Sequence, residues 1–307
     1  LYNTVDSIVV GKYLGDNALA AVGASWPLLN LLLVLFMGIA TGAGIMVSQY
    51  FGARDKEKLS RTVGTCVILT VLSSLLIMLV GYYLSGYMMD LLNTPEEIKG
   101  MTVEYLKIIF IGIIGAAFYN ILSGILRGMG DSVYPLLFLL TASALNIFLD
   151  ILFVSQFNME VAGVAWATII AQAISAVLCF IRLSSMKSLL NFGRETLKID
   201  WKLAEMLGRL GAPAGITQAI LSMSAIVVQS LTNSLGTQVI AAALVVMRVD
   251  GFCMMPNFTF GMAATTFVGQ NIGANRMDRV KQGTRDTMKL GFSVATVLII
   301  GILLFGK

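Results

Sequence analysis

Two acidic side chains stand in runs of this sequence that are otherwise apolar. Asp150 closes a stretch without other charges and follows Asn146 by one helical turn, and Asp6 lies in the apolar start of the chain. A charged side chain at the centre of a lipid bilayer costs about 2.5 to 3.5 kcal/mol even on the insertion scale with the lowest values. An acid kept in such a run is therefore a candidate for binding a proton or a cation.

Thr168 matches the two acids in depth along its own helix. Asp6 lies eight residues before the predicted helix end at 14, Asp150 lies seven before the end at 157, and Thr168 lies eight after the start at 160. At about 1.5 Å per residue, all three side chains are predicted roughly 10 to 12 Å below the same membrane surface. Residues at equal depth on three helices can share one site.

Helical spacing adds more polar side chains to the same helix faces. The stripes are Tyr2, Asn3 and Asp6; Asn120 and Ser123; Ser143, Asn146 and Asp150; and Thr168, Gln172 and Ser175. Polar stripes that converge inside a helix bundle indicate a water-filled cavity or a coordination site. Two carboxylates in a medium of low dielectric favour uptake of a proton or Na⁺, since burial and mutual repulsion oppose the doubly charged state. Oxygens of Asn120, Asn146 and Thr168 could complete the shell of a cation.

Other interpretations stay open for these residues. Asp6 and Asp150 could lie close to helix ends, where a carboxylate reaches the membrane surface or caps the helix. The hydroxyls of Ser and Thr residues can hydrogen-bond to their own helix at little cost. Sequence spacing alone does not decide between these roles and a shared binding site.

The elements that must position these residues are membrane-spanning helices. The chain is 57% hydrophobic and 12% charged, with a mean hydropathy of +0.84, whereas a soluble domain has about 25% charged residues. Nearly all of its charge-free runs meet the roughly 17 to 25 residues that a spanning helix needs. These runs are 18–53, 62–89, 108–126, 132–149, 161–181, 210–247, 251–275 and 290–306. With the apolar start they predict an all-α polytopic membrane protein with nine helices, since a β-barrel would need short alternating segments.

Lys and Arg residues lie mainly on one side of the predicted bundle. Sixteen of them fall at 54–61, 127, 182–209 and 276–289, and the opposite side holds only Lys12, Lys99 and Lys107. By the positive-inside rule the crowded side is cytoplasmic, so the N-terminus is predicted in the cytoplasm and the chain in the plasma membrane. The net charge of +4 then reflects topology and gives no reason to expect a nucleic-acid partner.

An internal repeat divides the chain. Residues 14–53 match residues 235–274 at a constant offset of 221 across two predicted helices and their loops. An even number of helices between the copies predicts parallel repeats. We therefore expect an N-lobe at 1–184, a cytoplasmic amphipathic connector at 185–201 and part of a C-lobe at 202–307. Residue 307 corresponds to Gly86 of the first copy, so about nine of twelve helices in two six-helix lobes are expected here.

Motifs of soluble enzymes and metal proteins are missing from the sequence. There is no His, which removes HExxH zinc sites and His-based triads, and there is no GxSxG motif. The cysteines Cys66, Cys179 and Cys253 are isolated, so neither a disulfide framework nor a structural metal is expected. We predict that the protein is not an enzyme and needs no cofactor. A membrane-embedded enzyme remains a remote alternative, although it would lack a nucleophile, base and metal ligands.

Several motifs together resemble one transporter family. They are LRGMGD at 126–131 with Pro135 after it, LNIFLD at 145–150, AGVA at 162–165, and VSQYFGA at 47–53 repeated as VGQNIGA at 268–274. In combination they resemble the multidrug and toxic compound extrusion (MATE) transporters of prokaryotes. That family belongs to a wider superfamily that also includes flippases for lipid-linked saccharides and polysaccharides.

The resemblance implies an antiporter coupled to H⁺ or Na⁺ that exports organic, often cationic, compounds as a monomer by alternating access. The implied coupling site is Asp6, Asn120, Asn146, Asp150 and Thr168, with transient Na⁺ at Asp6, Asn146, Asp150 and Thr168. The implied drug cavity is lined by Tyr2, Ser123, Ser143, Ala171 and Gln172. A flippase is the alternative within the superfamily, and it would show a more cationic central cavity.

Overall fold

The structure is a computed structural model of the chain. It describes residues 2–186, 188–191, 193, 196, 198–234 and 237–305. Within these ranges, the structure does not describe the side chains at 2–5, 35, 226, 229–230, 233–234, 237–238, 240–242, 244–245, 248, 252 and 305. Leu235 and Gly236, which open the second copy of the repeat, also lie outside the described residues.

The described residues form ten helices and no strand. The helices are α1 (Tyr2–Tyr13), α2 (Asp16–Gly52), α3 (Lys56–Leu91), α4 (Glu96–Ile111), α5 (Ile113–Gly128), α6 (Val133–Ser155), α7 (Glu160–Ser185), α8 (Trp201–Ser234), α9 (Thr237–Gly273) and α10 (Met277–Phe305). The sequence predicted one helix where the structure has α4 and α5, which meet at Gly112 with a bend of 49°. A Cβ at Gly112 would overlap the side chain of Ile169 in α7, so the break carries the backbone against that helix.

Length and composition identify membrane-spanning helices among the described residues. The helices α2, α3, α6, α7 and α10 are long and apolar enough to cross a bilayer, and the bent pair α4 and α5 is a sixth candidate. The described part of α1 has 12 residues, fewer than a span needs. An all-helical membrane protein is therefore confirmed, whereas the number of nine spanning helices remains a prediction.

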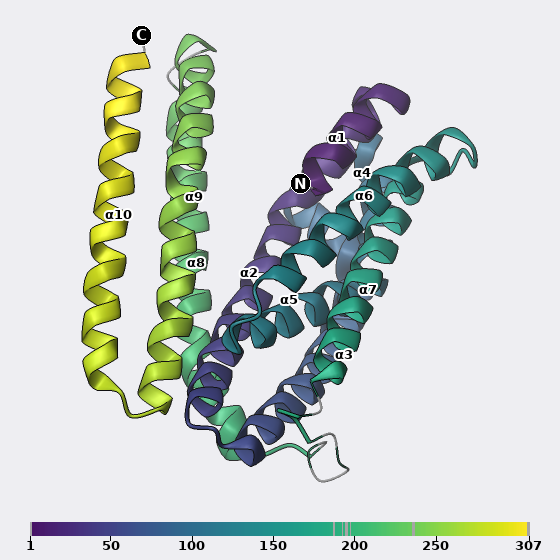
Figure 1. The fold of residues 1–307 in the computed structure, drawn as a ribbon. Helices are drawn as coiled ribbons and strands as arrows, with labels where there is room; N and C mark the ends of the chain where they lie inside the picture. The colour runs from purple at the N-terminus through teal and green to yellow at the C-terminus, as the bar shows by residue number, and fades with distance from the viewer. Residues whose placement is uncertain are drawn as a thin grey trace.

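The helices form two groups that diverge toward one end (Figure 1). One group contains α1 to α7 and the other contains α8 to α10, and the two meet near the loops at 53–55 and 274–276. We call this the convergent end, and the opposite end, with the loops at 92–95 and 156–159, the divergent end. The helix α2 joins the groups, since it packs against α5 in its own group and against α8 and α9 in the other.

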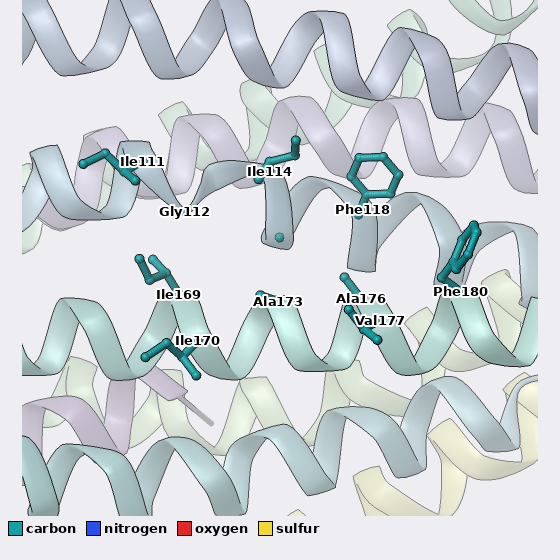
Figure 2. A pocket seen from close by; sticks show the side chains of 11 residues that line it. Ile111, Gly112, Ile114, Phe118, Ile169, Ile170, Ala173, Ala176, Val177 and Phe180 are labelled. Carbon is teal, nitrogen blue, oxygen red and sulfur yellow. The ribbon is translucent and has the colours of Figure 1, made fainter.

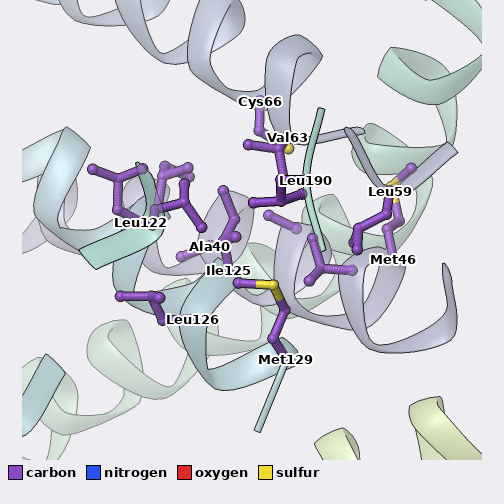
Figure 3. Close-up of a cluster of buried hydrophobic side chains, with 14 of the residues drawn as sticks. Ala40, Met46, Leu59, Val63, Cys66, Leu122, Ile125, Leu126, Met129 and Leu190 are labelled. Carbon is purple, nitrogen blue, oxygen red and sulfur yellow. The ribbon is translucent and has the colours of Figure 1, made fainter. Parts of the chain in front are cut away.

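A buried apolar cluster holds the first group together near the convergent end (Figure 3). It brings Met46 of α2 and Val63 of α3 against Ile125 and Leu126 of α5, and Leu190 from the segment after α7 also packs there. In a membrane such a cluster acts through close packing, because lipid tails are as apolar as the side chains. The packing fixes α2 relative to α3 and α5.

Glycine residues form close contacts between the two groups. A Cβ at Gly52 would overlap the carbonyl oxygen of Gln270, and a Cβ at Gly273 would overlap the carbonyl oxygen of Gln49. Nearby, a Cβ at Gly42 would lie 2.9 Å from the carbonyl oxygen of Leu207 in α8. We call the contact of Gln49 and Gly52 with Gln270 and Gly273 the glycine seam. Only residues without a side chain let α2 and α9 approach this closely.

The helices α2 and α9 have matching boundaries. Both have 37 residues, and α9 begins and ends 221 positions after α2. Each is followed by a residue in the left-handed backbone region, Arg54 (φ 55°) and Asn275 (φ 56°). Asp55 then caps α3 by accepting from the backbone N–H of Lys58 at 3.0 Å, and this bond lowers the pKa of Asp55. The division into lobes and connector stays a prediction, with α7 ending at Ser185 and α8 beginning at Trp201.

Candidate functional site

Four of the polar residues singled out in the sequence meet in one buried cluster. Asp6 comes from α1, Asn146 and Asp150 come from α6, and Thr168 comes from α7. Asn146 and Asp150 share a face of α6 because they are four residues apart. Asp6, Asn146 and Asp150 are all 0% exposed, and Thr168 is buried as well. Helical spacing and packing thus place three helices' polar stripes at one point.

Hydrogen bonds connect the cluster into a chain. The Thr168 hydroxyl donates to Asp6 Oδ2 at 3.3 Å. The Asn146 amide Nδ2 is 3.4 Å from Asp150 Oδ1 and 3.5 Å from Thr168 Oγ1, so it can donate to either oxygen. The Asp6 and Asp150 carboxyl groups also lie close enough to interact electrostatically. Two carboxylates this close in a buried site repel each other unless a proton or a cation is held between them.

The cluster has more hydrogen-bond acceptors than donors. Asp6 Oδ1, Asn146 Oδ1 and Asp150 Oδ2 are buried and have no hydrogen-bond partner in the structure. A buried acceptor without a donor is costly, by about 1 to 3 kcal/mol and more for a charged group. A proton or a small cation would satisfy these oxygens. The chemistry that this arrangement supports is therefore reversible binding of H⁺ or of a metal ion that prefers oxygen ligands.

The available ligands restrict which metal ion could bind. The described residues contain no group of three or more Cys, Asp or Glu side chains that could hold a metal ion. Two carboxylates with an amide and a hydroxyl oxygen are hard ligands, which suit a weakly held ion such as Na⁺ and do not suit zinc or copper. A structural metal is not expected from this donor set.

Tyr105 of α4 is a member of the site that sequence reasoning missed. Its side chain is 1% exposed and interacts electrostatically with both Asp6 and Asp150. It also belongs to the apolar cluster formed with Val9 and Val10 of α1 and Val161 and Val164 of α7, among others. The signal that could have found it was depth, since Tyr105 lies nine residues inside α4, close to the depth counted for Asp6 and Asp150.

The other predicted site residues are not bonded to the cluster. The Asn120 amide donates to the backbone oxygen of Ala116 in its own helix at 2.8 Å, and Ser123 Oγ donates to the backbone oxygen of Asn120 at 3.0 Å. Ser143 is buried with a hydroxyl that has no partner. Ala171 is buried and Gln172 is half-buried. The Tyr2 side chain lies outside the described residues.

A family model gives the first comparison with known proteins. The model for MatE matches residues 1–152 and 213–307, which together are more than half of the chain. The chain belongs to the MatE family. This match confirms the predicted family. It also confirms the predictions that the protein is a membrane protein and that it is not an enzyme.

Two curated relatives come from Bacillus subtilis (strain 168). The probable multidrug resistance protein YoeA is 34% identical over 308 residues, which cover 98% of this chain and 66% of the relative. The probable multidrug resistance protein YpnP is 31% identical over 279 residues, which cover 91% of this chain and 62% of the relative. The MatE chain described here therefore spans about two thirds of the length of these relatives.

Solved structures share the fold. A crystal structure of a MATE protein in the bent conformation superimposes with a TM-score of 0.91 at 22% identity, covering 100% of this chain and 68% of the other. A MOP superfamily transporter from Pyrococcus furiosus superimposes with a TM-score of 0.86 at 23% identity, covering 99% and 68%. For that transporter, reverse polarity of the binding pocket suggests a different function. The fold is thus shared with a MATE protein and with a MOP superfamily transporter whose binding pocket has reverse polarity.

Proposed function

We propose that the protein is an antiporter that uses entry of H⁺ or Na⁺ to export small organic, often cationic, compounds. The observation that carries this proposal is the buried two-acid cluster with its three unpartnered acceptor oxygens, on Asp6, Asn146 and Asp150. Binding a cation would satisfy these oxygens and so release free energy. A transporter can use that binding free energy to shift its conformational equilibrium. The names of the relatives, both probable multidrug resistance proteins, support export as the direction.

Alternating access would follow from the two-group architecture. The groups correspond to an N-lobe and a partial C-lobe related by the 221-residue repeat, and the matching bounds of α2 and α9 support that relation. The distribution of Lys and Arg supports an orientation with the divergent end outside the cell and the N-terminus in the cytoplasm. In this conformation the glycine seam closes the cytoplasmic side, and separation of α2 from α9 would open it. The protein would act as a monomer in the plasma membrane.

The roles of the residues follow from their contacts. Asp6 and Asp150 would hold the proton or Na⁺ between them, and Thr168 and Asn146 would supply oxygens and fix both carboxylates. Binding links α1 to α6 and α7, so loading and unloading the cation changes how firmly α1 is attached to the other two helices. Ser123, Ser143, Ala171 and Gln172, with Tyr2, would line the cavity for the organic compound. A flippase is less well supported, because the described cluster contains no Lys or Arg for a phosphorylated lipid.

Reconstitution into liposomes tests the proposal directly. We expect uptake of a fluorescent organic cation into inside-out vesicles when a gradient of H⁺ or of Na⁺ is imposed, and at most background uptake with neither. The H⁺ gradient and the Na⁺ gradient are imposed in separate measurements at zero membrane potential, so comparison of the two identifies the coupling ion. Equal uptake with and without gradients would refute coupled antiport, and uptake that needs added ATP would refute it as well.

Removing the Tyr105 hydroxyl should weaken the cation site without abolishing it. The Tyr105 side chain is buried and interacts electrostatically with both acids, so Tyr105→Phe removes a polar group beside the cluster and leaves the hydrogen bonds within the cluster in place. Loss of one such polar interaction costs about 1 kcal/mol, which is about fivefold in affinity. We expect about a fivefold rise in the H⁺ or Na⁺ concentration that half-saturates transport, with an unchanged maximal rate. Tyr83→Phe, at an exposed position of α3, is the control.

A further inference from the structure

An apolar groove lies between α5 and α7 of the first helix group (Figure 2). Ile111 at the end of α4 and Phe118 of α5 face Ile169, Ala173, Val177 and Phe180 of α7 across it, and its volume is about 430 Å³. The groove begins where α4 breaks at Gly112, because the bend separates α5 from the direction of α4. Its lining is almost entirely apolar and includes the exposed side chains of Ile111, Val177 and Phe180, so in a membrane the groove can contact lipid tails.

A second cavity adjoins this groove at a polar end. Its volume is about 340 Å³, and Tyr82 of α3 lines it with Glu104, Lys107 and Ile111 of α4. Ile111 lines both cavities, so the apolar groove continues into the polar one along α4. The exposed Tyr83 and Tyr87 lie close along the chain on α3. Exposed Tyr residues are enriched at the level of lipid headgroups, and Tyr83 and Tyr87 lie between Tyr82 and the divergent end of α3, so the polar cavity lies on the tail side of that level in the membrane leaflet at the divergent end.

The polar cavity presents one positive and one negative side chain that form no ion pair within the described residues. Glu104 is exposed and Lys107 is half-buried, and they are three residues apart on α4. The Lys107 ammonium lies over the ring of Tyr82, 5.5 Å from its centroid. In the described part of the chain, neither Glu104 nor Lys107 forms an ion pair. Charged side chains that face lipid need a partner of opposite charge, and the described residues supply none for Glu104 or Lys107.

We propose that the two cavities form one site for a phospholipid whose headgroup carries a primary amine. Lys107 would bind the phosphate, Glu104 would accept from the ammonium group, and one acyl chain would fill the groove between α5 and α7. The order of charges fits a zwitterionic headgroup. An anionic lipid would leave Glu104 without a donor, and a quaternary ammonium group carries no N–H to donate to it.

The position of the site gives the bound lipid a structural role. Glu104 is adjacent in sequence to Tyr105, and Ile169 is adjacent to Thr168, so α4 and α7 carry cluster residues on one face and lipid-site residues on the other. A lipid held between them would brace the break at Gly112 from outside. This role is independent of the proposed transport activity.

Native mass spectrometry of the detergent-purified protein tests the site with three lipids of identical acyl chains. We expect phosphatidylethanolamine to be retained several-fold more than phosphatidylcholine or phosphatidylglycerol. Glu104→Gln should reduce the retention of phosphatidylethanolamine to that of phosphatidylcholine. Val177→Trp and Ala173→Leu, both at exposed positions in the groove, should reduce retention of all three lipids. Ile174→Trp, at an exposed position of α7 outside the groove, is the matched control and should retain lipid as the unchanged protein does.

Two results would overturn the proposal. Equal retention of the three lipids, or stronger retention of phosphatidylglycerol, would show that the headgroup is not recognised by this charge pair. Unchanged retention in both Val177→Trp and Ala173→Leu would show that lipid binds elsewhere. Circular dichroism and thermal unfolding of each variant separate loss of the site from loss of the fold, because the groove variants change exposed positions only.

Discussion

Asp150→Asn is expected to reduce cation-coupled export strongly while leaving the fold intact. The amide has nearly the shape of the carboxyl group but binds no proton and only weakly attracts Na⁺. It also adds two N–H donors to a cluster that has three buried acceptor oxygens without partners. The variant should therefore unfold at the same temperature as the unchanged protein or at a higher one. A loss of function with no loss of stability would separate a coupling role from a structural one.

The size of the effect follows from the energy that the cation contributes. Hydrogen bonds to charged groups contribute about 1.5 to 3 kcal/mol, and a ligand shifts a conformational equilibrium only by its difference in affinity for the two states. Loss of that energy corresponds to about a 10- to 100-fold fall in gradient-driven export. Asp6→Asn should give the same result, because both acids face one cation. Asp16→Asn, at an exposed position where α2 begins, should export normally.

The measurement is initial export rate against external pH and Na⁺ in cells and in proteoliposomes. In the unchanged protein the rate should depend on the coupling ion, and in both cluster variants the remaining rate should not. Full gradient-driven export by either variant would refute the assignment of that acid. Restored export in Asp150→Glu, with a shifted dependence on the ion, would add support, since that variant restores the charge and changes only the reach of the side chain.

Counting residues from loop ends was enough to predict the core of the cluster. Asp6, Asp150 and Thr168 meet in the structure because straight helices convert equal distances in sequence into equal depth. The depth of a residue does not tell which way its helix is rotated about its own axis. A polar side chain can also form its hydrogen bond within its own helix. Asn120 does so with Ala116, and its stripe gave no sign of that choice.

The break at Gly112 could not be predicted for a different reason. A single Gly in an apolar run is tolerated in a straight helix, and what decides here is a contact with Ile169, 57 positions further along the chain. Contacts between segments that are distant in the sequence cannot be predicted from local sequence patterns.

Gly52→Ala is expected to open the glycine seam. The new methyl group would overlap the carbonyl oxygen of Gln270, which belongs to the backbone of α9 and cannot rotate away. Gly273→Ala should act in the same way on the opposite side, through the carbonyl oxygen of Gln49. Forcing extra atoms into a close contact costs about 1 to 3 kcal/mol, which is about a 5- to 100-fold shift away from the conformation in which α2 and α9 touch.

Electron paramagnetic resonance measures this shift. Glu57→Cys and Asp278→Cys place spin labels on exposed positions at the starts of α3 and α10, on the two sides of the seam. The unchanged protein should show mainly one short distance, and both seam variants should add a longer one. Gly23→Ala in α2 and Gly261→Ala in α9 are matched controls, because a Cβ at either position meets no atom within 4 Å. All four substitutions remove a flexible residue from a helix, which alone stabilises it by about 0.5 to 1 kcal/mol. A distance change confined to the seam variants would therefore isolate the contact, whereas the same short distance in all four would mean that the seam does not hold the lobes together.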